Sequence, residues 1–342
     1  MKRTALYLDG KGSAELREEQ LDGPAEGQVL VQALVSSISS GTEMLFFRNQ
    51  VPSDLPVDSS IATLAADLSY PLKYGYCSVG LVSGLGRGVP ADWLGKRVFA
   101  FNPHETHFLA EPASLMPLPE DINAEAAAFL PNMETAVNFV MDGRPMIGDQ
   151  VAVLGQGIVG LLTTALLARM PVASLVTLDR LPLRREWSLR LGAAASLDPA
   201  RPGVAAEARQ RLRGDRPFPA ADLTFELSGA PEALNLAIEL TGFDGTVLIG
   251  SWYGQKRAEI NLGGAFHRSR IRLVSSQVST INPAWQGRWS KDRRFALAWE
   301  MIREIHPEQL ITQRIAFEKA PDAYQLLDQT PEETLQVVLT YD

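Results

Sequence analysis

The sequence predicts an α/β protein that begins with a β-rich part and continues into a parallel sheet flanked by helices. Short strand-like runs, separated by clusters of Gly, Pro and Asp, dominate the first third of the chain. From about residue 123 onwards, apolar strand-like segments alternate with helix-like segments. Such alternation is typical of βα units around a mostly parallel sheet with helices on both faces.

The first part of the chain is expected to form short strands joined by turns. Each run is apolar and is bounded by turn-forming residues, and the runs are Thr4–Leu8, Val29–Ser36, Val79–Leu85 and Arg97–Phe101. Between them, the segment Gln50–Tyr70 carries Pro52 and Pro56 among small and acidic residues. We expect this segment to be a long loop over a cleft.

The middle and last parts of the chain are expected to supply the parallel sheet and its helices. After a helical region that starts near Asn123, the expected strands are Asp222–Leu227, Gly245–Gly250 and Ile271–Val278, with a helix over Pro231–Leu240. Beyond Pro283 we expect helices over Arg293–Ile305 and Pro321–Leu327 and a closing strand over Thr334–Thr340. No internal repeat or low-complexity tract interrupts this order.

Composition and charge exclude several classes of protein. A chain of 342 residues is long for one core, so two domains are expected. The net charge of −8 argues against nucleic acid as a main partner. The single cysteine, Cys77, excludes an internal disulfide and fits a reducing compartment. Because no signal region follows Met1 and no segment is long and apolar enough to span a membrane, we expect a cytoplasmic protein.

One glycine-rich stretch carries the strongest functional signal. An apolar run, Val151–Leu154, stops at Gly155-Gln156-Gly157, and a helix-like stretch follows from Ile158 to Met170. In a dinucleotide-binding turn the first glycine permits the turn, the second admits the pyrophosphate and the third lets helix and strand pack closely. The predicted cofactor contacts are therefore Gly155, Gln156, Gly157, Ile158, Val159 and Gly160. The competing interpretation is a glycine-rich turn in some other α/β sheet.

A second apolar run, Leu175–Leu178, ends at Asp179, which we expect to accept hydrogen bonds from the adenosine ribose. This acid favours NAD, whereas Arg180 and Arg184 would suit the 2′-phosphate of NADP, the alternative cofactor. Residues at the carboxyl ends of later strands are also expected near the cofactor, because ligands of such sheets bind there. These residues are Ser228, Gly229, Gly250 and Ser251; ordinary turn chemistry would account for them equally well.

Three further stretches carry a family resemblance. They are Ile38-Ser-Ser-Gly-Thr-Glu43, Tyr74-Gly-Tyr-Cys-Ser-Val-Gly80 and Gly95-Lys-Arg-Val-Phe99. With the glycine turn, they make the chain resemble the medium-chain dehydrogenase/reductase superfamily, which includes the zinc alcohol dehydrogenases. The resemblance implies a GroES-like catalytic domain over residues 1–130, a Rossmann domain over 131–279 and a return to the catalytic domain over 280–342. It also implies a cofactor between the domains, with Thr135 near the nicotinamide.

The resemblance bears on the oligomeric state as well. Phe266-His-Arg-Ser-Arg270 precedes the strand that, in dimeric members of the superfamily, pairs across a two-fold axis. A homodimer is therefore implied. His267 and Arg268 could reach the cleft and meet an anionic substrate or the cofactor, and the plainer alternative is a solvated basic edge. Trp285 and Trp289, which follow shortly after, would lie in the core or wall the substrate pocket.

The chain departs from the superfamily where zinc is bound. In the places of the catalytic ligands stand Ser40, Tyr76 and Cys77, and one cysteine cannot build a four-cysteine structural site. We therefore expect neither zinc. One alternative metal set remains, in which Cys77 joins His104 and His107 with help from Glu105. The plainer interpretation of Cys77 is a small buried core residue.

Without zinc, hydrogen-bond donors must stabilise charge on the substrate oxygen. The catalytic candidates are Ser40, Thr42, Tyr76 and His104, from segments that would border the cleft. Tyr76 would equally serve as a core tyrosine with a satisfied hydroxyl, and His104 as a surface or core histidine with satisfied nitrogens. Glu43 is expected to order its loop through hydrogen bonds rather than to act in catalysis.

The leading functional hypothesis is a zinc-independent NAD(P)-dependent oxidoreductase acting on a small-molecule secondary alcohol or ketone. A second hypothesis is reduction of an activated C=C bond, as in the quinone and enoyl reductases of the same superfamily. A third, from a different class, is a non-catalytic nucleotide-binding sensor. Turnover separates the sensor from both enzymes, because a sensor binds NADH without consuming it.

Overall fold

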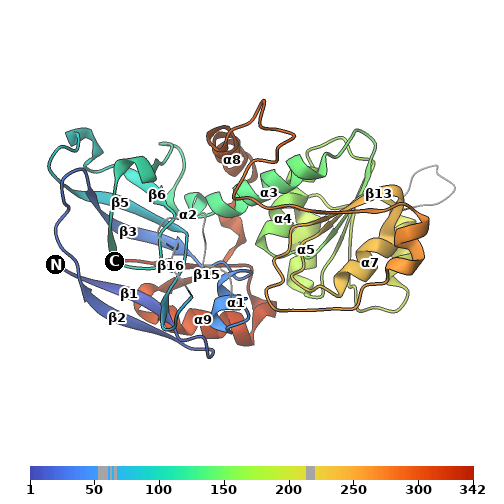
Figure 1. The fold of residues 1–342 in the computed structure, drawn as a ribbon, viewed down its shortest axis with the longest axis horizontal. Helices are drawn as coiled ribbons and strands as arrows, with labels where there is room; N and C mark the ends of the chain where they lie inside the picture. The colour runs from blue at the N-terminus through green and yellow to red at the C-terminus, as the bar shows by residue number, and fades with distance from the viewer. Residues whose placement is uncertain (53–60, 62–63, 65–67, 213–219) are drawn as a thin grey trace. The chain divides into compact units, whose positions relative to one another are not determined.

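The computed structural model describes residues 1–342 except 53–60, 62–63, 65–67 and 213–219. The chain forms two compact units, one made of Met1–Pro131 with His306–Asp342 and the other of Asn132–Ile305. The first unit is built on antiparallel and mixed sheets and the second on a parallel sheet with helices (Figure 1). The α/β fold that the sequence predicts is confirmed.

The first unit contains two sheets. A three-stranded sheet has the order β2-β1-β4, formed by Ala14–Gln20, Lys2–Leu8 and Leu72–Lys73. A larger sheet has the order β15-β16-β3-β5-β6-β8, and its β3 also pairs with β7. Its strands are Ile311–Ala316, Gln336–Thr340, Val29–Ser37, Ser78–Leu85, Arg97–Ala100, Met116–Pro117 and, for β7, His107–Ala110.

Alternation in β3 sets the inner face of the larger sheet. Val29, Val31, Ala33 and Val35 are buried while the residues between them are partly exposed, as the two-residue period of a strand requires. Three short helices, α1 (Glu43–Phe47), α2 (Ala124–Ala127) and α9 (Ala320–Gln329), complete this unit. All five residues of α1 are buried, so its first residue, Glu43, is carried into the interior.

The second unit has one parallel sheet with the order β11-β10-β9-β12-β13-β14. The strands are Ala195–Leu197, Ser174–Leu178, Gln150–Leu154, Ala221–Glu226, Thr241–Ile249 and Arg272–Ser275. This order is the 3-2-1-4-5-6 arrangement of Rossmann sheets, in which ligands bind where the order reverses. The reversal lies between β9 and β12, directly beside the glycine turn.

Helices α3 (Leu130–Gly143), α4 (Ile158–Leu167), α5 (Pro182–Arg190), α6 (Val204–Arg211), α7 (Ala233–Leu240) and α8 (Lys291–Ile305) accompany this sheet. Apolar residues of β9 are buried on both sides of the sheet, with Ala152 and Leu154 in one cluster and Val151 and Val153 in another. A strand covered on both faces reads as a continuous apolar run, as β9 does. In the described part of the chain, no helix combines the length and apolar character needed to cross a membrane.

The structure differs from the sequence-based expectation in several places. The sequence divided the chain at 279/280, whereas the second unit extends to Ile305 and includes α8. Among the elements that had not been expected are β2, whose exposed face is almost entirely charged, the five-residue helix α1, and β15. The expected loop Gln50–Tyr70 lies largely outside the described residues.

A buried arginine explains why α8 belongs to the second unit. The Arg294 side chain is fully buried, and its Nε and Nη2 donate to Glu134 Oε1 of α3 at 3.0 and 2.7 Å. Its Nη1 also donates to Asn138 Oδ1, and to the Thr280 carbonyl at 3.2 Å. Burial raises the pKa of the Glu134 carboxyl, and the Arg294 charge opposes that rise. This ion pair therefore fastens α8 and the segment before it to α3.

Replacing Arg294 should destabilise the second unit strongly. In Arg294→Met, Glu134 would keep its burial and lose its counter-charge, which typically costs about 3–5 kcal/mol. The neighbouring exposed residue gives a matched control, because Arg293→Met removes a stacked surface cation and should cost at most about 1 kcal/mol. Urea unfolding of both variants measures the difference. Equal stabilities would show that the buried pair does not hold α8 in place.

Candidate nucleotide site and polar centre

The glycine turn joins β9 to α4 in a conformation that other residues would not tolerate. Gly155 has a φ of +90°, and a Cβ atom there would lie 2.5 Å from the backbone of Leu227 and Ser228. Both the left-handed conformation and the close approach to the chain after β12 therefore require glycine. Gly160 is required for a different reason, because a Cβ atom on it would lie 2.0 Å from the Gly155 carbonyl oxygen.

Gly157 is not required by the protein's own packing. It has an ordinary φ of −65°, and the nearest atom to a Cβ built on it is Arg184 Nη1 at 3.9 Å. The first helical hydrogen bond of α4 runs from Leu161 N to Gly157 O at 2.8 Å. The N–H groups of Ile158, Val159 and Gly160 thus precede the helical ladder, where a helix attracts anions. The space at Gly157 fits the approach of a pyrophosphate to the backbone.

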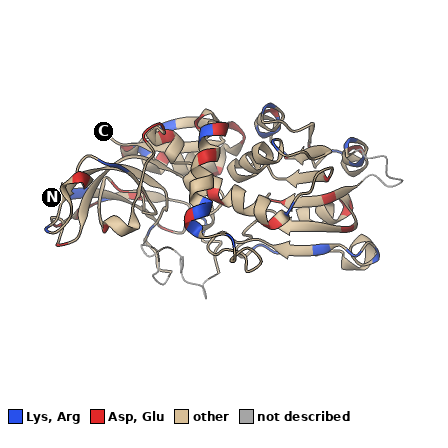
Figure 2. Ribbon diagram, turned by 90° about the horizontal axis from the view of Figure 1, so that it is seen from above, with Lys and Arg blue, Asp and Glu red and all other residues tan. Residues whose placement is uncertain are grey.

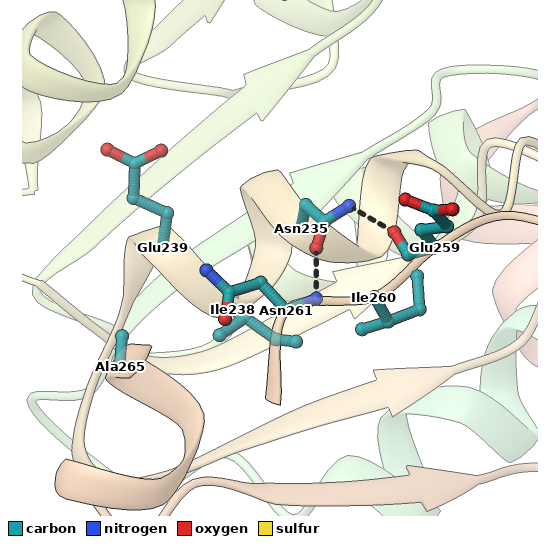
Figure 3. Close-up of a pocket in the computed structure, with 7 residues that line it drawn as sticks. All are labelled: Asn235, Ile238, Glu239, Glu259, Ile260, Asn261 and Ala265. Atoms are coloured by element: carbon teal, nitrogen blue, oxygen red, sulfur yellow. Dashed lines mark hydrogen bonds between the residues drawn. The ribbon is translucent and has the colours of Figure 1, made fainter. Parts of the chain in front are cut away.

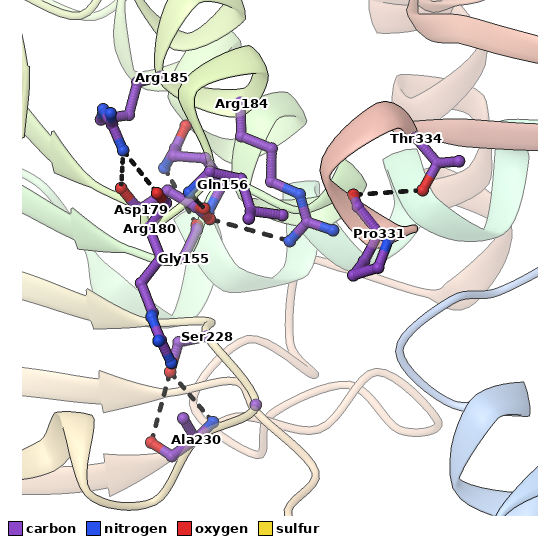
Figure 4. Close-up of polar contacts among 12 residues, drawn as sticks. Gly155, Gln156, Asp179, Arg180, Arg184, Arg185, Ser228, Ala230, Pro331 and Thr334 are labelled. Atoms are coloured by element: carbon purple, nitrogen blue, oxygen red, sulfur yellow. Dashed lines mark hydrogen bonds and ion pairs between the residues drawn. The ribbon is translucent and has the colours of Figure 1, made fainter. Parts of the chain in front are cut away.

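Asp179, directly after β10, braces the turn (Figure 4). Its side chain is almost buried; Oδ2 accepts from Gln156 N at 2.7 Å and Oδ1 from Leu181 N at 2.8 Å. Gln156 is fully buried and its amide bonds to Gly155 O and Thr164 Oγ1. Gln156 therefore shapes the turn from inside. Each Asp179 oxygen has a second lone pair with which to accept a ribose hydroxyl.

Three arginines surround Asp179 in different ways (Figure 4). Arg185 Nη1 donates to the carbonyls of Asp179 and Arg180, both at 2.8 Å, and so closes the start of α5. Arg184 Nη1 lies 3.9 Å from Asp179 Oδ2, and its buried Nε has no acceptor among the described residues. The Arg180 side chain is exposed. Arg184 therefore lies near both Gly157 and the Asp179 carboxylate.

The ends of β12 and β13 bring the remaining predicted residues of the sheet together. Ser251 Oγ accepts from Gly229 N at 2.9 Å and donates to Glu226 O. Glu226 is fully buried and accepts from Ser228 N at 2.8 Å and from the Tyr253 hydroxyl. Glu226 had not been predicted as part of the site. Its position as an acidic last residue of the apolar strand β12 is the sequence signal that could have indicated it. Gly250 lets Phe139 approach, and Thr135 lies on α3.

The first unit contains a polar centre around Glu43. The Glu43 carboxylate is fully buried and accepts from Ser39 N at 2.8 Å, from His104 Nε2 at 3.0 Å and from the Tyr324 hydroxyl. His104 Nδ1 lies 2.7 Å from Ser36 Oγ. These bonds order the turn before α1, which is the structural role that the sequence assigned to Glu43.

Tyr76 lies at the partly exposed edge of this centre. Its hydroxyl donates to Ser39 Oγ at 2.5 Å. Burial raises the pKa of the Tyr76 phenol to about 12, against the hydrogen bonds to Ser39 and Thr42. Ser40 and Thr42 occupy the same turn and are partly exposed. Sequence reasoning missed Ser39, although it adjoins Ser40 in the quoted stretch.

His104 lies deeper than the other catalytic candidates. It is fully buried, both ring nitrogens have partners, and a Cβ atom on Gly75 would lie 2.6 Å from its ring. The structure thus joins His104 to Glu43 and Ser36, and joins Tyr76 to Ser39. A direct part for His104 in proton transfer stays a prediction.

The alternative metal set is not assembled. Cys77 Sγ donates to Ala128 O at 3.0 Å, and burial raises the pKa of this thiol to about 12. Glu105 forms ion pairs with Arg3 and Lys73 at 3.0 and 3.2 Å. In the described ranges, no group of three His, Cys, Asp or Glu side chains is placed to hold a metal ion.

A pocket of about 530 Å³ on the second unit contains none of the predicted site residues (Figure 3). It lies between α7 and residues 259–265. The Asn235 side chain bridges its wall, donating to Glu259 O and accepting from Asn261 N, both at 2.9 Å. The pocket therefore shares no lining residue with the glycine turn.

Comparison with curated proteins identifies dehydrogenases and reductases. The chain is 25% identical over 330 residues to D-guloside 3-dehydrogenase of Escherichia coli K12, covering 92% of this chain and 93% of the relative. It is 23% identical over 351 residues to a protein of the same bacterium described as zinc-type alcohol dehydrogenase-like, with 94% and 95% covered. D-xylulose reductase A of Aspergillus oryzae is 25% identical over 208 residues, 60% of this chain and 55% of the relative. No family model matches the chain.

Solved structures share the fold over nearly the whole chain. 2R,3R-butanediol dehydrogenase of Bacillus subtilis superposes with a TM-score of 0.79 at 18% identity, covering 99% of this chain and all of that one. An alcohol dehydrogenase from Escherichia coli CFT073, complexed with NADH, superposes with a TM-score of 0.78 at 17% identity, and 99% of both chains is covered. A Sinorhizobium meliloti dehydrogenase bound to NADP gives 0.75 at 19% identity, also with 99% of both covered. Together, the comparisons indicate an oxidoreductase.

The two glycines of the turn should respond differently to the same substitution. Gly160→Ala forces a methyl group against the Gly155 carbonyl, and such overpacking typically costs about 1–3 kcal/mol of unfolding free energy. Gly157→Ala places its methyl group in open space and should change stability by no more than about 0.5 kcal/mol. Chemical denaturation of the two variants tests this contrast. It fails if Gly157→Ala is the more damaging change.

Proposed function

We propose that the protein is a zinc-independent, NAD(P)-dependent oxidoreductase that interconverts a secondary alcohol and a ketone. One observation carries the proposal: in the turn after β9, at the reversal point of a Rossmann sheet, a side chain at Gly157 would meet only the Arg184 guanidinium, at 3.9 Å. Gly155 and Gly160 are explained by the protein's own packing, whereas Gly157 is explained by a ligand that must approach the backbone.

NAD is the proposed cofactor, and NADP is the alternative. When bound, a nicotinamide nucleotide supplies or accepts the hydride, and the protein supplies binding and orientation. The α4 N-terminus would hold the pyrophosphate, and Asp179 would accept from the ribose hydroxyls and repel a 2′-phosphate. Arg184, whose Nε has no acceptor in the described part of the chain, is the residue that would favour NADP instead.

The chain's own hydroxyls would manage charge on the substrate oxygen. Because its pKa is raised to about 12, the Tyr76 phenol stays protonated at neutral pH. Its single O–H donates to Ser39 Oγ in the structure, and it would exchange this bond for one to the developing alkoxide when substrate binds. Ser39 Oγ accepts a hydrogen bond from the Tyr76 hydroxyl and so holds the phenol in place. The Glu43 carboxylate in turn holds Ser39 by accepting from the Ser39 backbone N–H. We propose Tyr76 as the main donor, with Ser40 and Thr42 beside it and His104 acting through Glu43.

The donor chemistry around Tyr76 supports zinc independence. The positions that resemble zinc-ligand positions hold a hydroxyl, a phenol and a thiol, in Ser40, Tyr76 and Cys77. The thiol and the phenol both have a raised pKa, so neither readily supplies the deprotonated atom that a metal needs. The residues present therefore do not fit a catalytic zinc, and no step of the proposed reaction uses one.

The names of the relatives favour an alcohol over an activated C=C bond as the substrate. The proteins similar over most of the chain include dehydrogenases of a guloside and of butanediol. Both names denote hydroxylated molecules with secondary alcohols. We therefore propose a small polyhydroxylated alcohol or its ketone as the substrate class.

We further propose a homodimer formed through the edge strand β14. Arg272 and Ser275 are exposed, Val274 is 37% exposed, and β14 pairs on one side only, with β13. Phe243, in β13, is 74% exposed. An open edge strand with apolar neighbours favours pairing with a second chain.

The nucleotide assignment is tested by titrating the protein and Gly157→Val with NADH and NADPH. Binding at a hundred times the dissociation constant should raise the stability of the parent by about 2.7 kcal/mol. Gly157→Val should fold normally and lose this stabilisation, because its side chain fills the space that the pyrophosphate needs. Preference for NADH supports Asp179 as the ribose contact. Equal binding by Gly157→Val would contradict the proposed site.

The role of Tyr76 is tested by Tyr76→Phe, with Tyr70→Phe as the matched control. Tyr70 lies in the same unit, donates to Phe46 O and also has a pKa of about 12. Loss of one donor to a developing oxyanion typically lowers kcat about 10²–10³-fold, and NADH affinity should stay unchanged. The Tyr76 pKa of about 12 also sets the expected pH dependence: between about pH 7 and pH 10 the phenol stays protonated, so the parent should lose no activity through ionisation of Tyr76.

The substrates that are turned over separate the three functional hypotheses. Turnover of enones but not of ketones would favour the C=C reductase. Binding of NADH without any turnover would favour the sensor.

A further inference from the structure

A cluster of arginines and tryptophans lies on the second unit, apart from the glycine turn. Arg144 follows α3, while Trp285, Arg288, Trp289 and Arg293 lie just before α8 and in its first residues; we call these five residues the Trp285 cluster. The guanidinium carbons of Arg144 and Arg288 lie 4.5 and 5.0 Å from the centre of the Trp285 ring. That of Arg293 lies 4.1 Å from the Trp289 ring.

Backbone hydrogen bonds hold the Trp285 cluster in one arrangement. Trp285 O accepts from Arg288 N at 2.8 Å and from Trp289 N at 2.9 Å. The segment is fixed to α3 because Asn282 Nδ2 donates to Asp142 Oδ1 at 3.0 Å. The buried Arg294 fastens the other end. The guanidinium groups are therefore arranged in advance, which lowers the entropy lost when they bind a ligand.

The cations of the cluster have no acidic partners. Within the described ranges, no carboxylate lies at ion-pair distance from Arg144, Arg288 or Arg293. By contrast, Arg190, which also lies over a tryptophan ring, pairs with Glu186 at 2.5 Å. The chain as a whole has a net charge of −8, so acidic residues are not scarce. The concentration of positive charge is local, and Figure 2 shows Lys and Arg positions in blue at one end of the helix that begins at Lys291.

A second, independent observation points to a ligand at the same place. The Trp285 Nε1 atom is buried and has no acceptor among the described residues. A buried donor without an acceptor costs about 1–3 kcal/mol, so a partner for this N–H would be stabilising. An acceptor that also carries negative charge would satisfy this N–H group and the neighbouring guanidinium groups together.

We propose that the Trp285 cluster binds the phosphate group of a phosphorylated ligand. Guanidinium forks match phosphate oxygens with paired hydrogen bonds, and the Trp285 N–H would supply a further donor. The positive end of α8, which begins at Lys291, adds to the attraction. This site is distinct from the proposed nucleotide turn, and it stands whether or not the chain oxidises an alcohol.

Two sources can carry such a phosphate: a free phosphorylated metabolite or the headgroup of an anionic phospholipid. The loop after Arg144 bears on this choice, because Met146 and Ile147 are 69% and 85% exposed. Apolar side chains beside arginines suit a lipid surface, where they can enter the headgroup region. The phosphate chemistry is common to both sources, and they are separated by experiment.

Binding of inorganic phosphate, measured by calorimetry at constant ionic strength without nucleotide, tests the site. Arg288→Gln should weaken binding about tenfold or more, as expected for a lost charge-assisted hydrogen bond. Trp285→Phe keeps the ring but removes the N–H, and should weaken binding several-fold. Arg190→Gln is the matched control and should bind as the parent does. Gly157→Val should also leave phosphate binding unchanged, which separates this site from the nucleotide turn.

A second arm uses vesicles of phosphatidylcholine with and without phosphatidic acid. Sedimentation with the acidic vesicles, lost in Ile147→Ser and in Arg288→Gln, would assign the phosphate to a lipid headgroup. Phosphate binding without vesicle binding would assign it to a soluble metabolite. The proposal is overturned if the parent binds neither probe, or if Trp285→Phe and Arg288→Gln bind as tightly as Arg190→Gln. Retained NADH binding in these variants would show that the nucleotide site is unaffected.

Discussion

The hydrogen bond from Gln156 N to Asp179 Oδ2 is the contact on which the second unit's function depends. It ties the turn after β9 to the end of β10, while Gly155 and Gly160 let the turn press against β12 and α4. These contacts enclose Gly155 and Gly160, whereas Gly157 stays partly exposed. The N–H groups at the start of α4 then lie next to that position. Asp179 thus builds the turn as well as facing the proposed ribose.

The first unit uses a buried carboxylate in a comparable way. The Glu43 carboxylate is enclosed, and burying its charge would cost free energy if it had no hydrogen-bond donors. Its donors are Ser39 N, His104 and Tyr324. Once satisfied, it fixes the Ser39 backbone, and Ser39 in turn accepts from Tyr76. The partly exposed phenol is therefore positioned from behind by groups that a substrate would not touch. In the proposed reaction, this layering would give His104 and Glu43 a positioning role behind Ser39, and Tyr76 the place next to the substrate.

The sequence allowed the Rossmann sheet, its glycine turn and Asp179 to be predicted, because each depends on local spacing. Apolar runs, glycines and a strand-end acid lie within 30 residues of one another. Contacts between distant segments could not be predicted in this way. Glu43 meets His104 across 61 positions and Tyr324 across 281, and Arg294 meets Glu134 across 160. The compact unit that ends at Ile305 could not be anticipated from the sequence for the same reason, since a charged residue in a helical pattern gives no sign that it will be buried.

The described structure contains polar groups of two kinds, and the difference between them is informative. Glu43, Glu226 and Arg294 are fully buried and have several partners each, so they explain the fold and call for no ligand. Arg184 Nε and Trp285 Nε1 belong to partly exposed side chains and have no acceptor among the described residues. The two nitrogen atoms are covered, but other atoms of their side chains are exposed, whereas the whole side chain of Gln150, which also lacks partners among the described residues, is enclosed. Unpaired donors at reachable side chains, close to cations, are thus the physical sign by which a phosphate site can be distinguished from an internal defect.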